Sequence, residues 1–340
     1  MQRLPMFGDD DDHLRTAADV LCDGGLVAFP TETVYGLGAI AHDAQAVRKI
    51  FAAKGRPPDD PLIVHVRPQW NLSTIVAEIP PLASALMDAL WPGPLTLVLP
   101  KSDDLPDTVT SGLPDVAVRA PSHPVAIRLL DAVGAPLAAP SANRFSYVSA
   151  TTADHVIADL GDSVDLVLDG GPADAGIEST VIRVVGDSIT VLRRGALTVE
   201  QIRNAVPDID HITEARSDSD ATASPGRMLK HYSPTTRTVA ARSGTIPNIE
   251  TADVCFLTYA DTNAAQIPSS WAVVTLGSRD DLDQVARNLY STLRYVDTAG
   301  HDLIVIEMTG AAGLGEALDD RITRASSGTV ASSTRFTDGG

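Results

Sequence analysis

FPTETVYGLG, residues 29–38, contains two threonines, a glutamate, a tyrosine and two glycines behind a short apolar run. Gly36, Gly38 and Ala41 match the spacing G-x-G-x-x-A of a dinucleotide-binding turn. That interpretation fails, because the predicted strand ends about six residues before Gly36, whereas the fingerprint needs the turn directly after the strand. The next helix is predicted to begin after Asp43, whose side chain suits an N-cap. We therefore reject a dinucleotide-binding loop.

Alternation of short apolar runs with helical patterns through residue 205 predicts an α/β domain of roughly 210 residues. Its predicted strands are 25–29, 62–66, 95–99, 116–119, 137–139, 166–169, 181–185 and 189–192. Its predicted helices are 13–22, 44–54, 81–90, 124–133, 153–160 and 199–205. Because the last two strands follow each other without a helix, the sheet is predicted to be mixed rather than purely parallel.

A change of composition divides the chain. Residues 213–226, TEARSDSDATASPG, are rich in Ser, Thr, Ala and Asp and contain no core-forming residue, which is typical of a linker. Beyond them, strands are predicted at 238–241, 254–258, 273–276 and 303–307, and helices near 282–296 and 315–325. The predicted parts of the chain are a domain at 1–212, a linker or lid at 213–236, a smaller α/β domain at 237–326 and a flexible tail at 327–340.

The overall composition argues against several classes of protein. The net charge of −18, with only 26 basic residues, argues against a protein that coats nucleic acid through counter-ion release, so no tight direct tRNA binding is expected. Cys22 and Cys255 are predicted to be free thiols rather than a disulfide. No apolar leader is visible at the N-terminus, and no run approaches the ~18 apolar residues of a membrane span. We expect a cytoplasmic protein without membrane association.

Three common catalytic signatures are missing from the sequence. It contains neither a G-x-x-x-x-G-K-[ST] P-loop nor a G-x-S-x-G nucleophile elbow. The eight histidines lie singly, with no i, i+4 pair, so a helix-borne zinc site is not expected. We therefore assign no metal ligand to a protein side chain.

The stretch KGRPPDDPL, residues 54–62, allows two interpretations. Lys54 can be the cationic end of a helix that matches the helix dipole, with Gly55 ending the helix and a turn following. Alternatively, Lys54 and Arg56 form a two-cation clamp for phosphate, in which arginine supplies a planar fork. The paired prolines favour the clamp, because they restrict its movement.

Four further stretches place polar side chains at strand ends: DVAVRAP at 115–121, APSANRFS at 139–146, GIESTVI at 176–182 and VLRRGAL at 191–197. Individually each signal is weak. Arg119 can form a surface ion pair, and Ser141 with Asn143 can cap a turn. Together they place four candidate cationic positions and several hydroxyls at the loop edges of one domain, which predicts a cleft for an anionic ligand.

In combination these motifs are far more specific than each is alone. FPTETVYGLG, KGRP, VAVRAP, APSAN, IESTV and LRRG, in this order and at this spacing, resemble the YrdC-like threonylcarbamoyl-AMP synthase family. The resemblance covers residues 13 to about 205 and continues through SPGRMLKHYSP, residues 224–234, and GLGEALDDRITRAS. The chain looks like the longer, two-domain form of the family. This implies a YrdC-like α/β domain with a twisted mixed sheet and helices, followed by a smaller Rossmann-like α/β domain.

The resemblance implies L-threonylcarbamoyladenylate synthase activity, which is that of a nucleotidyltransferase. Family members condense L-threonine, bicarbonate and ATP to threonylcarbamoyl-AMP and pyrophosphate. Downstream threonylcarbamoyl-transfer proteins then use this product for the t6A modification of the adenosine next to the anticodon of ANN-decoding tRNAs. Because three anionic partners must meet, positioning and charge neutralisation are expected to dominate the catalysis, with Mg²⁺ bound to ATP.

The resemblance also implies the residues of the site. For L-threonine these are Thr33, Tyr35, His65, Arg119, Ala139 and Ser179. For ATP they are Lys54, Arg56, Asp60, Asp115, Ser141, Asn143, Ser149, Arg193, His231 and Tyr232. Charge stabilisation during catalysis is assigned to Lys54 and Arg56.

The sequence departs from the family pattern at three places. Asp60 stands where the family often has Asn, and Asp115 stands where a Thr is common, so both put acids close to the expected phosphates. The linker has S-P-G-R-M-L-K-H-Y instead of the more usual S-P-G-M-K-Y-R-H-Y. Because the linker combines a flexible tether with cations, prolines and aromatic residues, residues 217–236 are predicted to form a mobile lid over the nucleotide.

Two alternative functions stay open at this point. The fold could serve as a non-catalytic RNA-binding or regulatory YrdC-like protein, although the net charge opposes direct tRNA binding. It could also be a carbamoyl-transfer domain of the hydrogenase-maturation type. Such domains usually occur in much longer chains that include acylphosphatase and zinc-finger parts.

Overall fold

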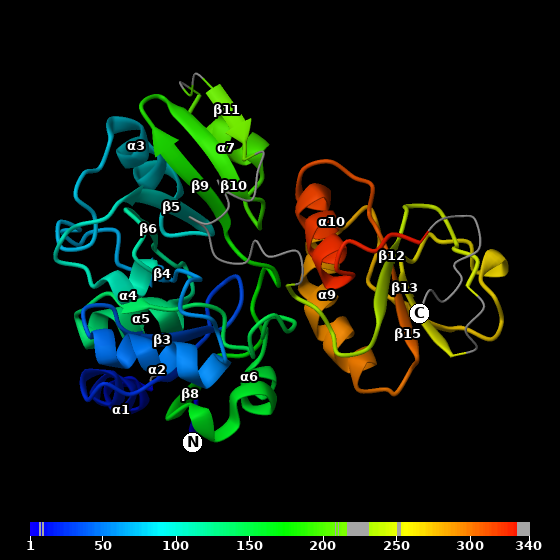
Figure 1. Ribbon diagram of the computed structural model, residues 1–340, viewed down its shortest axis with the longest axis horizontal. Helices are drawn as coiled ribbons and strands as arrows, with labels where there is room; N and C mark the ends of the chain where they lie inside the picture. Colours follow the sequence, from blue (N-terminus) through cyan, green and yellow to red (C-terminus); the bar gives the residue numbers. More distant parts are fainter. Residues whose placement is uncertain are drawn as a thin grey trace. The chain divides into compact units, whose positions relative to one another are not determined.

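The computed structural model divides the chain into two compact units (Figure 1). It describes residues 1–6, 8, 10–207, 209, 211–215, 231–249 and 253–331. The first unit comprises Met1–Phe145 and Ser149–Arg227, and the second comprises Ser146–Val148 and Met228–Gly340. Much of the predicted lid, residues 216–230, lies outside the described residues, as do residues 332–340 of the predicted tail. The four-part division of the chain stays a prediction.

The first unit is built on an eleven-stranded sheet with the strand order β1-β8-β2-β3-β7-β4-β6-β5-β9-β10-β11. The strands are β1 (Gln2–Pro5), β2 (Val27–Phe29), β3 (Gly36–Ile40), β4 (Ile63–His65), β5 (Leu95–Pro100), β6 (Asp115–Arg119), β7 (Leu137–Ala138), β8 (Leu166–Asp169), β9 (Thr180–Val185), β10 (Ser188–Arg193) and β11 (His211–Glu214). β4 pairs with β6 in parallel, whereas β5 pairs with β6 and β9 with β10 in antiparallel orientation. The prediction of a mixed sheet is confirmed.

The helices of this unit cover both faces of the sheet. They are α1 (Asp11–Cys22), α2 (Ala44–Lys54), α3 (Pro81–Leu90), α4 (Asp107–Thr110), α5 (Pro124–Val133), α6 (Ala153–Leu160) and α7 (Val199–Ala205), with a 3₁₀ turn at Gly161–Ser163. Helices α1 and α5 pack on Val27 and Phe29 of β2, whereas α2, α3 and α7 share the core that contains Ala28. Since neighbouring residues of a strand point to opposite faces, a strand between two helical layers is apolar throughout.

The stretch that opens the sequence analysis forms two strands and the loop between them. Residues 36–40, for which the sequence pattern predicts no strand, form β3, which pairs with β2 in antiparallel orientation. The reason is steric. A Cβ atom on Gly38 would lie 2.8 Å from Cε1 of Phe29, and one on Gly36 would lie 3.3 Å from Cζ of the same ring. The two glycines therefore let the Phe29 ring lie against the neighbouring strand.

Helix α2 begins and ends as the sequence indicates. The Asp43 carboxylate accepts hydrogen bonds from the backbone N–H groups of Gln45 and Ala46, which makes it the N-cap. Gly55 ends the helix with a φ of 63°, in the left-handed region that favours glycine. Lys54 thus lies in the last turn, at the start of the KGRPP stretch.

The second unit contains a four-stranded parallel sheet with the order β12-β15-β13-β14. Its strands are β12 (Thr238–Ala241), β13 (Val254–Thr258), β14 (Ala272–Thr275) and β15 (Leu303–Glu307), and its helices are α9 (Leu282–Asp297) and α10 (Leu314–Ala325), with a 3₁₀ turn at Ala264–Gln266. Figure 1 shows α9 and α10 on the same side of this sheet. The predicted smaller α/β domain is thus confirmed as a fold. Among the described residues, no helix is both long and apolar enough to cross a bilayer.

The two cysteines should differ in reactivity. Both are free, as predicted; Cys22 at the end of α1 is exposed, whereas Cys255 lies buried in β13. Burial and the nearby Asp253 carboxylate raise the pKa of Cys255 to about 11, so the reactive thiolate is scarce at neutral pH. A disulfide reagent at pH 8 should therefore modify Cys22 rapidly and Cys255 only after unfolding. The Cys255→Ser variant, which keeps Cys22, should react rapidly in the native state. Equally rapid reaction of the native Cys22→Ser variant, which keeps Cys255, would contradict this.

Candidate functional site

Four polar side chains on adjacent strands lie on one face of the large sheet: His65 in β4, Arg119 in β6, Thr96 in β5 and Ser179 directly before β9. Each is two residues from a member of a small apolar cluster, which contains Ile63, Ala117, Val98 and Val181. Residues two apart in a strand share a face. The polar group is thus positioned by the strands themselves.

The strand register brings this group close together. His65 and Thr96 both lie opposite Arg119, in the neighbouring strands on either side of β6. Thr96 Oγ1 is 2.7 Å from Ser179 Oγ, which connects β5 to the start of β9. Three of the predicted threonine residues, namely His65, Arg119 and Ser179, therefore belong to one cluster.

Arg119 is the centre of the cluster and is buried. Its Nη1 donates a hydrogen bond of 2.8 Å to Thr33 Oγ1, so the TETVYG loop and β6 meet here. Its Nη2 lies 2.6 Å from Oε1 of Glu32, and the other oxygen of Glu32 accepts a hydrogen bond from the Ser122 N–H. Although burial raises the pKa of Glu32, attraction to the Arg119 guanidinium outweighs this, so the pKa lies below its usual value. The two form a buried ion pair.

His65 is uncharged in this environment. Burial, and then repulsion by Arg119, lower its pKa to about 3. Its ring packs edge-on against Phe29, with the ring centroids 6.0 Å apart. Within the described part of the chain, its Nδ1 atom has no hydrogen-bond partner. A neutral imidazole with an unused nitrogen can exchange a hydrogen bond with a polar ligand without adding charge.

The TETVYG loop is held by its own hydroxyls. Thr31 Oγ1 lies 2.9 Å from Thr33 Oγ1 and donates to the Val34 carbonyl. Tyr35 is fully buried, and its hydroxyl donates to the Gly171 carbonyl at 2.6 Å. Burial, together with the nearby Asp169 carboxylate, raises the pKa of Tyr35. Tyr35 thus anchors the loop, and its assignment as a threonine contact stays a prediction.

The predicted ATP residues Arg56 and Asp60 form an ion pair, and the charges of Lys54 and Arg193 also act on Asp60. Arg56 Nη2 lies 2.8 Å from Asp60 Oδ1 and also donates to the Pro61 carbonyl, so the KGRPP turn is closed by its own ion pair. Burial raises the pKa of Asp60, and Arg56, Lys54 and Arg193 oppose that rise. Arg193 connects this group to the threonine group, because its Nη2 donates to both the carbonyl and the hydroxyl of Ser179.

The loop at 139–151 carries the remaining ATP candidates and is joined to α2. Lys54 Nζ donates to the carbonyls of Ser141 and Asn143, and Phe145 N–H donates back to the carbonyl of Lys54. Ser149 Oγ donates a 2.6 Å hydrogen bond to Glu178. The predicted threonine contact Ala139 lies at the start of the same loop, where its N–H donates to the carbonyl of Ile63 in β4. The loop is therefore anchored at several points along its length.

The other three predicted ATP residues are Asp115, His231 and Tyr232. Asp115 is at the opposite end of β6 from Arg119 and pairs with Arg183 at 3.1 Å. His231 and Tyr232 belong to the second unit, where both are buried. There the Tyr232 ring stacks on Tyr290 at 5.6 Å and lies under the Arg321 guanidinium at 5.1 Å. Their contacts with ATP stay predictions.

Sequence reasoning assigned no role to three members of the site, Glu32, Glu178 and Thr96. Glu32 stands inside the quoted TETVYG motif, for which the family resemblance implies roles only for Thr33 and Tyr35. One signal could have found it, because an arginine that ends an apolar strand needs a counter-ion when it is buried. Glu178 likewise stands inside a quoted motif, GIESTVI, directly before the predicted threonine residue Ser179. Thr96 is an ordinary residue of an apolar strand, and only the sheet register shows its place.

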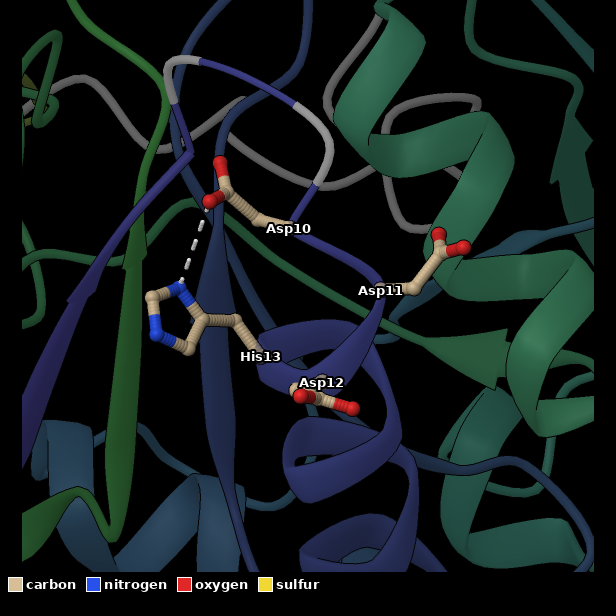
Figure 2. Close-up of a pocket in the computed structure, with 4 residues that line it drawn as sticks. All are labelled: Asp10, Asp11, Asp12 and His13. Atoms are coloured by element: carbon tan, nitrogen blue, oxygen red, sulfur yellow. Dashed lines mark ion pairs between the residues drawn. The ribbon is translucent and has the colours of Figure 1, made fainter.

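A separate pocket of about 260 Å³ lies at the start of α1 and is lined by Asp10, Asp11, Asp12 and His13 (Figure 2). Each aspartate has a basic neighbour. Asp11 pairs with Arg128 at 2.7 Å, Asp12 pairs with Arg15 at 3.1 Å, and Asp10 lies 3.9 Å from the His13 ring. Among the residues that the structure describes, no group of three or more His, Cys, Asp or Glu could hold a metal ion. None of the predicted site residues lines this pocket.

Comparison with known proteins gives the family. The Sua5/YciO/YrdC family model, described as "Telomere recombination", matches residues 19–195, and a model described as "Threonylcarbamoyl-AMP synthase, C-terminal domain" matches residues 197–327. A threonylcarbamoyl-AMP synthase of Pyrococcus abyssi is 40% identical over 92% of this chain and 94% of its own length. The chain belongs to the threonylcarbamoyl-AMP synthase family. A family member from Bacillus subtilis is also 40% identical, over 94% of this chain and 95% of its own.

The fold of a solved threonylcarbamoyl-AMP synthase family member agrees with that of this chain. The crystal structure of P. abyssi Sua5 complexed with L-threonine has a TM-score of 0.85 and 34% sequence identity, and the match covers 99% of both chains. The resemblance drawn from the motifs is thus confirmed at the level of family and fold. The roles of individual residues stay predictions.

Proposed function

We propose that this protein is an L-threonylcarbamoyladenylate synthase, which condenses L-threonine, bicarbonate and ATP to threonylcarbamoyl-AMP and pyrophosphate. The observation that carries the proposal is the buried Arg119 guanidinium, flanked by Thr33, in a family with a relative that has been solved with L-threonine. A guanidinium matches a carboxylate in geometry and charge. The hydroxyls and the neutral His65 surround it with groups suited to a small polar amino acid.

ATP is proposed to bind at the cationic group. Arg56 pairs with Asp60, Lys54 bonds to the loop that carries Ser141 and Asn143, and the charges of Lys54 and Arg193 also act on Asp60, which supports a shared site for the triphosphate. Because Arg193 also donates to Ser179, the position of the nucleotide is linked to that of the threonine. This proximity matters, since holding two reactants together replaces an encounter in solution by a step within one complex.

The chemistry proceeds in two bond-forming steps. The threonine amine attacks the carbon of bicarbonate, and loss of water gives a carbamate. A carbamate oxygen then attacks the α-phosphorus of ATP, and pyrophosphate leaves. The protein's part is to position the reactants and to neutralise developing charge, for which Lys54 and Arg56 are proposed. Neither step needs a nucleophilic side chain.

Mg²⁺ is proposed to arrive with ATP. The described residues offer no cluster of carboxylates or histidines for it, and Mg²⁺ is commonly held by substrate phosphates and water. When bound, it would share the neutralisation of the triphosphate. The product would pass to threonylcarbamoyl-transfer proteins in the cytoplasm that modify the adenosine next to the anticodon of ANN-decoding tRNAs.

The proposed activity predicts a threonine-dependent release of pyrophosphate. The purified full-length protein, given ATP, Mg²⁺, bicarbonate and L-threonine, should release pyrophosphate and capture labelled bicarbonate in an acid-labile adenylate. Leaving out threonine should remove both signals. Equal pyrophosphate release with and without threonine would overturn the proposal. Binding of threonine and ATP without any release would favour the non-catalytic alternative, and turnover of carbamoyl phosphate in place of threonine would favour carbamoyl transfer.

A further inference from the structure

Glu32 is held in a fixed position beside Arg119. Only 8% of Glu32 and 4% of Arg119 is exposed. One carboxylate oxygen of Glu32 accepts the Ser122 N–H at 3.1 Å, and the other lies 2.6 Å from Arg119 Nη2. A buried charge needs a partner of opposite sign, and here Glu32 and Arg119 are each other's counter-ion. The pair therefore adds no net charge to the site.

The other titratable side chains nearest to this pair do not change its balance. Burial is the main cause that lowers the pKa of both His65 and His123, and both imidazoles are therefore neutral at pH 7. The second cationic side chain of the cluster, Arg193, is directed at Ser179. Among the described residues, Glu32 is thus the charged side chain paired with Arg119, whereas Arg193 reaches the cluster through Ser179.

Arg119 retains capacity to bind a second carboxylate. A guanidinium has five N–H donors; Arg119 Nη1 donates to Thr33, and Nε donates to the Gly93 carbonyl at 3.4 Å. Although Glu32 is close to Nη2, neither Arg119 Nη2 nor Glu32 Oε1 has a hydrogen bond of good geometry within the described residues. Even with one Nη2 N–H facing Glu32, the contacts among the described residues leave N–H groups of Arg119 for a second carboxylate.

We propose that Glu32 is a specificity-determining residue, which makes the site select a zwitterionic amino acid over an anion of the same shape. The inference rests on the proposed function, in which the substrate carboxylate binds Arg119. With Glu32 ionised, a ligand that brings only a carboxylate leaves one uncompensated negative charge in a buried place. A ligand that also brings an ammonium group leaves none. A nearby unit charge changes such equilibria by about tenfold to a thousandfold.

The test compares two ligands that differ only in the amino group. (R)-3-hydroxybutanoate has the carboxylate, hydroxyl and methyl groups of L-threonine but no ammonium. Calorimetric titration of the full-length wild-type protein at pH 7 should give an affinity for L-threonine at least about thirtyfold higher than for 3-hydroxybutanoate. In Glu32→Gln this ratio should fall by about tenfold or more, because the anion then meets an uncompensated guanidinium.

The controls separate this role from a structural one. Glu78→Gln removes the same charge from an exposed position and should leave the ratio unchanged. If Glu32 only supports the fold, Glu32→Gln weakens both ligands equally, and an unchanged ratio overturns the proposal. Should Glu32→Gln not fold, equal wild-type affinity for the two ligands overturns it instead. A wild-type protein that binds neither ligand would contradict the proposed function rather than the role of Glu32.

Discussion

Replacing Arg119 with methionine should lower the free energy of unfolding of the first unit by about 3–5 kcal/mol at pH 7 and weaken threonine binding by about a hundredfold. The first effect has an electrostatic cause. The side chain of Glu32 is 10% exposed and loses its only ion-pair partner among the described residues, so the variant buries an uncompensated carboxylate. The second effect follows because the substrate carboxylate loses the guanidinium that is proposed to bind it.

A double variant separates the two effects. Arg119→Met with Glu32→Gln removes both charges, so most of the lost stability should return while threonine binding stays weak. Urea unfolding in a Trp271→Phe background would report the first unit through Trp70 and Trp91. A double variant as unstable as the single one would show that the loss comes from packing rather than from the unpaired carboxylate.

The pH dependence provides an independent check on the same pair. In the wild type the pKa of Glu32 is depressed, so its stabilising contribution is present above the unfolded pKa and is lost as the pH falls through the folded pKa. In Arg119→Met the guanidinium no longer lowers the pKa of Glu32, so burial, the largest cause, should raise this pKa against the backbone hydrogen bonds that remain. The deficit of the variant should then shrink as the pH falls, because the carboxyl becomes protonated. A deficit that stays constant between pH 8 and pH 5 would contradict this account.

Most of the helices and strands could be predicted, because the periodicity of apolar residues and the capping of helices are local features of the sequence. The boundaries of α2, α3, α5, α6 and α7 match the predicted ones, and α2 shows why, since Asp43 and Gly55 define its ends chemically. The strand β3 could not be predicted in this way. Its glycines disfavour a strand on propensity, and only the Phe29 ring from the neighbouring strand explains them.

The motifs indicate part of the cluster around Arg119 but not its internal contacts. The motif order indicates Thr33, His65 and Arg119, yet the hydrogen bond between Arg119 and Thr33 joins residues 86 positions apart. Such contacts depend on the sheet order, in which β4 and β5 lie on either side of β6. The buried carboxylates illustrate the same limit. Whether Glu32 is a solvated loop residue or a counter-ion depends on burial, which composition and spacing do not specify.

The sequence alone allows two interpretations of Lys54, as the end of a helix or as part of a phosphate clamp. The structure shows a buried ammonium that donates to the carbonyls of Ser141 and Asn143, while the N–H of Phe145 donates back to the carbonyl of Lys54. Helix α2 and the loop at 139–151 are therefore bonded in both directions. Because Ser141 and Asn143 are themselves proposed ATP contacts, the position of this loop should control nucleotide affinity as well as stability.

Replacing Lys54 with methionine should lower the free energy of unfolding of the first unit by about 2–4 kcal/mol, since two buried carbonyls lose a charge-assisted donor. ATP affinity should fall by at least about tenfold, because the loop that carries Ser141 and Asn143 loses its anchor and the triphosphate loses a nearby cation. Urea unfolding and calorimetric ATP titration of the full-length protein measure the two effects. Arg48→Met is the matched control, as it removes an exposed cation from the same helix and should change neither quantity appreciably. A loss of stability with unchanged ATP affinity would restrict Lys54 to a structural role. Unchanged stability with weaker ATP binding would show that its bonds to the loop contribute little and that its charge acts on the nucleotide directly.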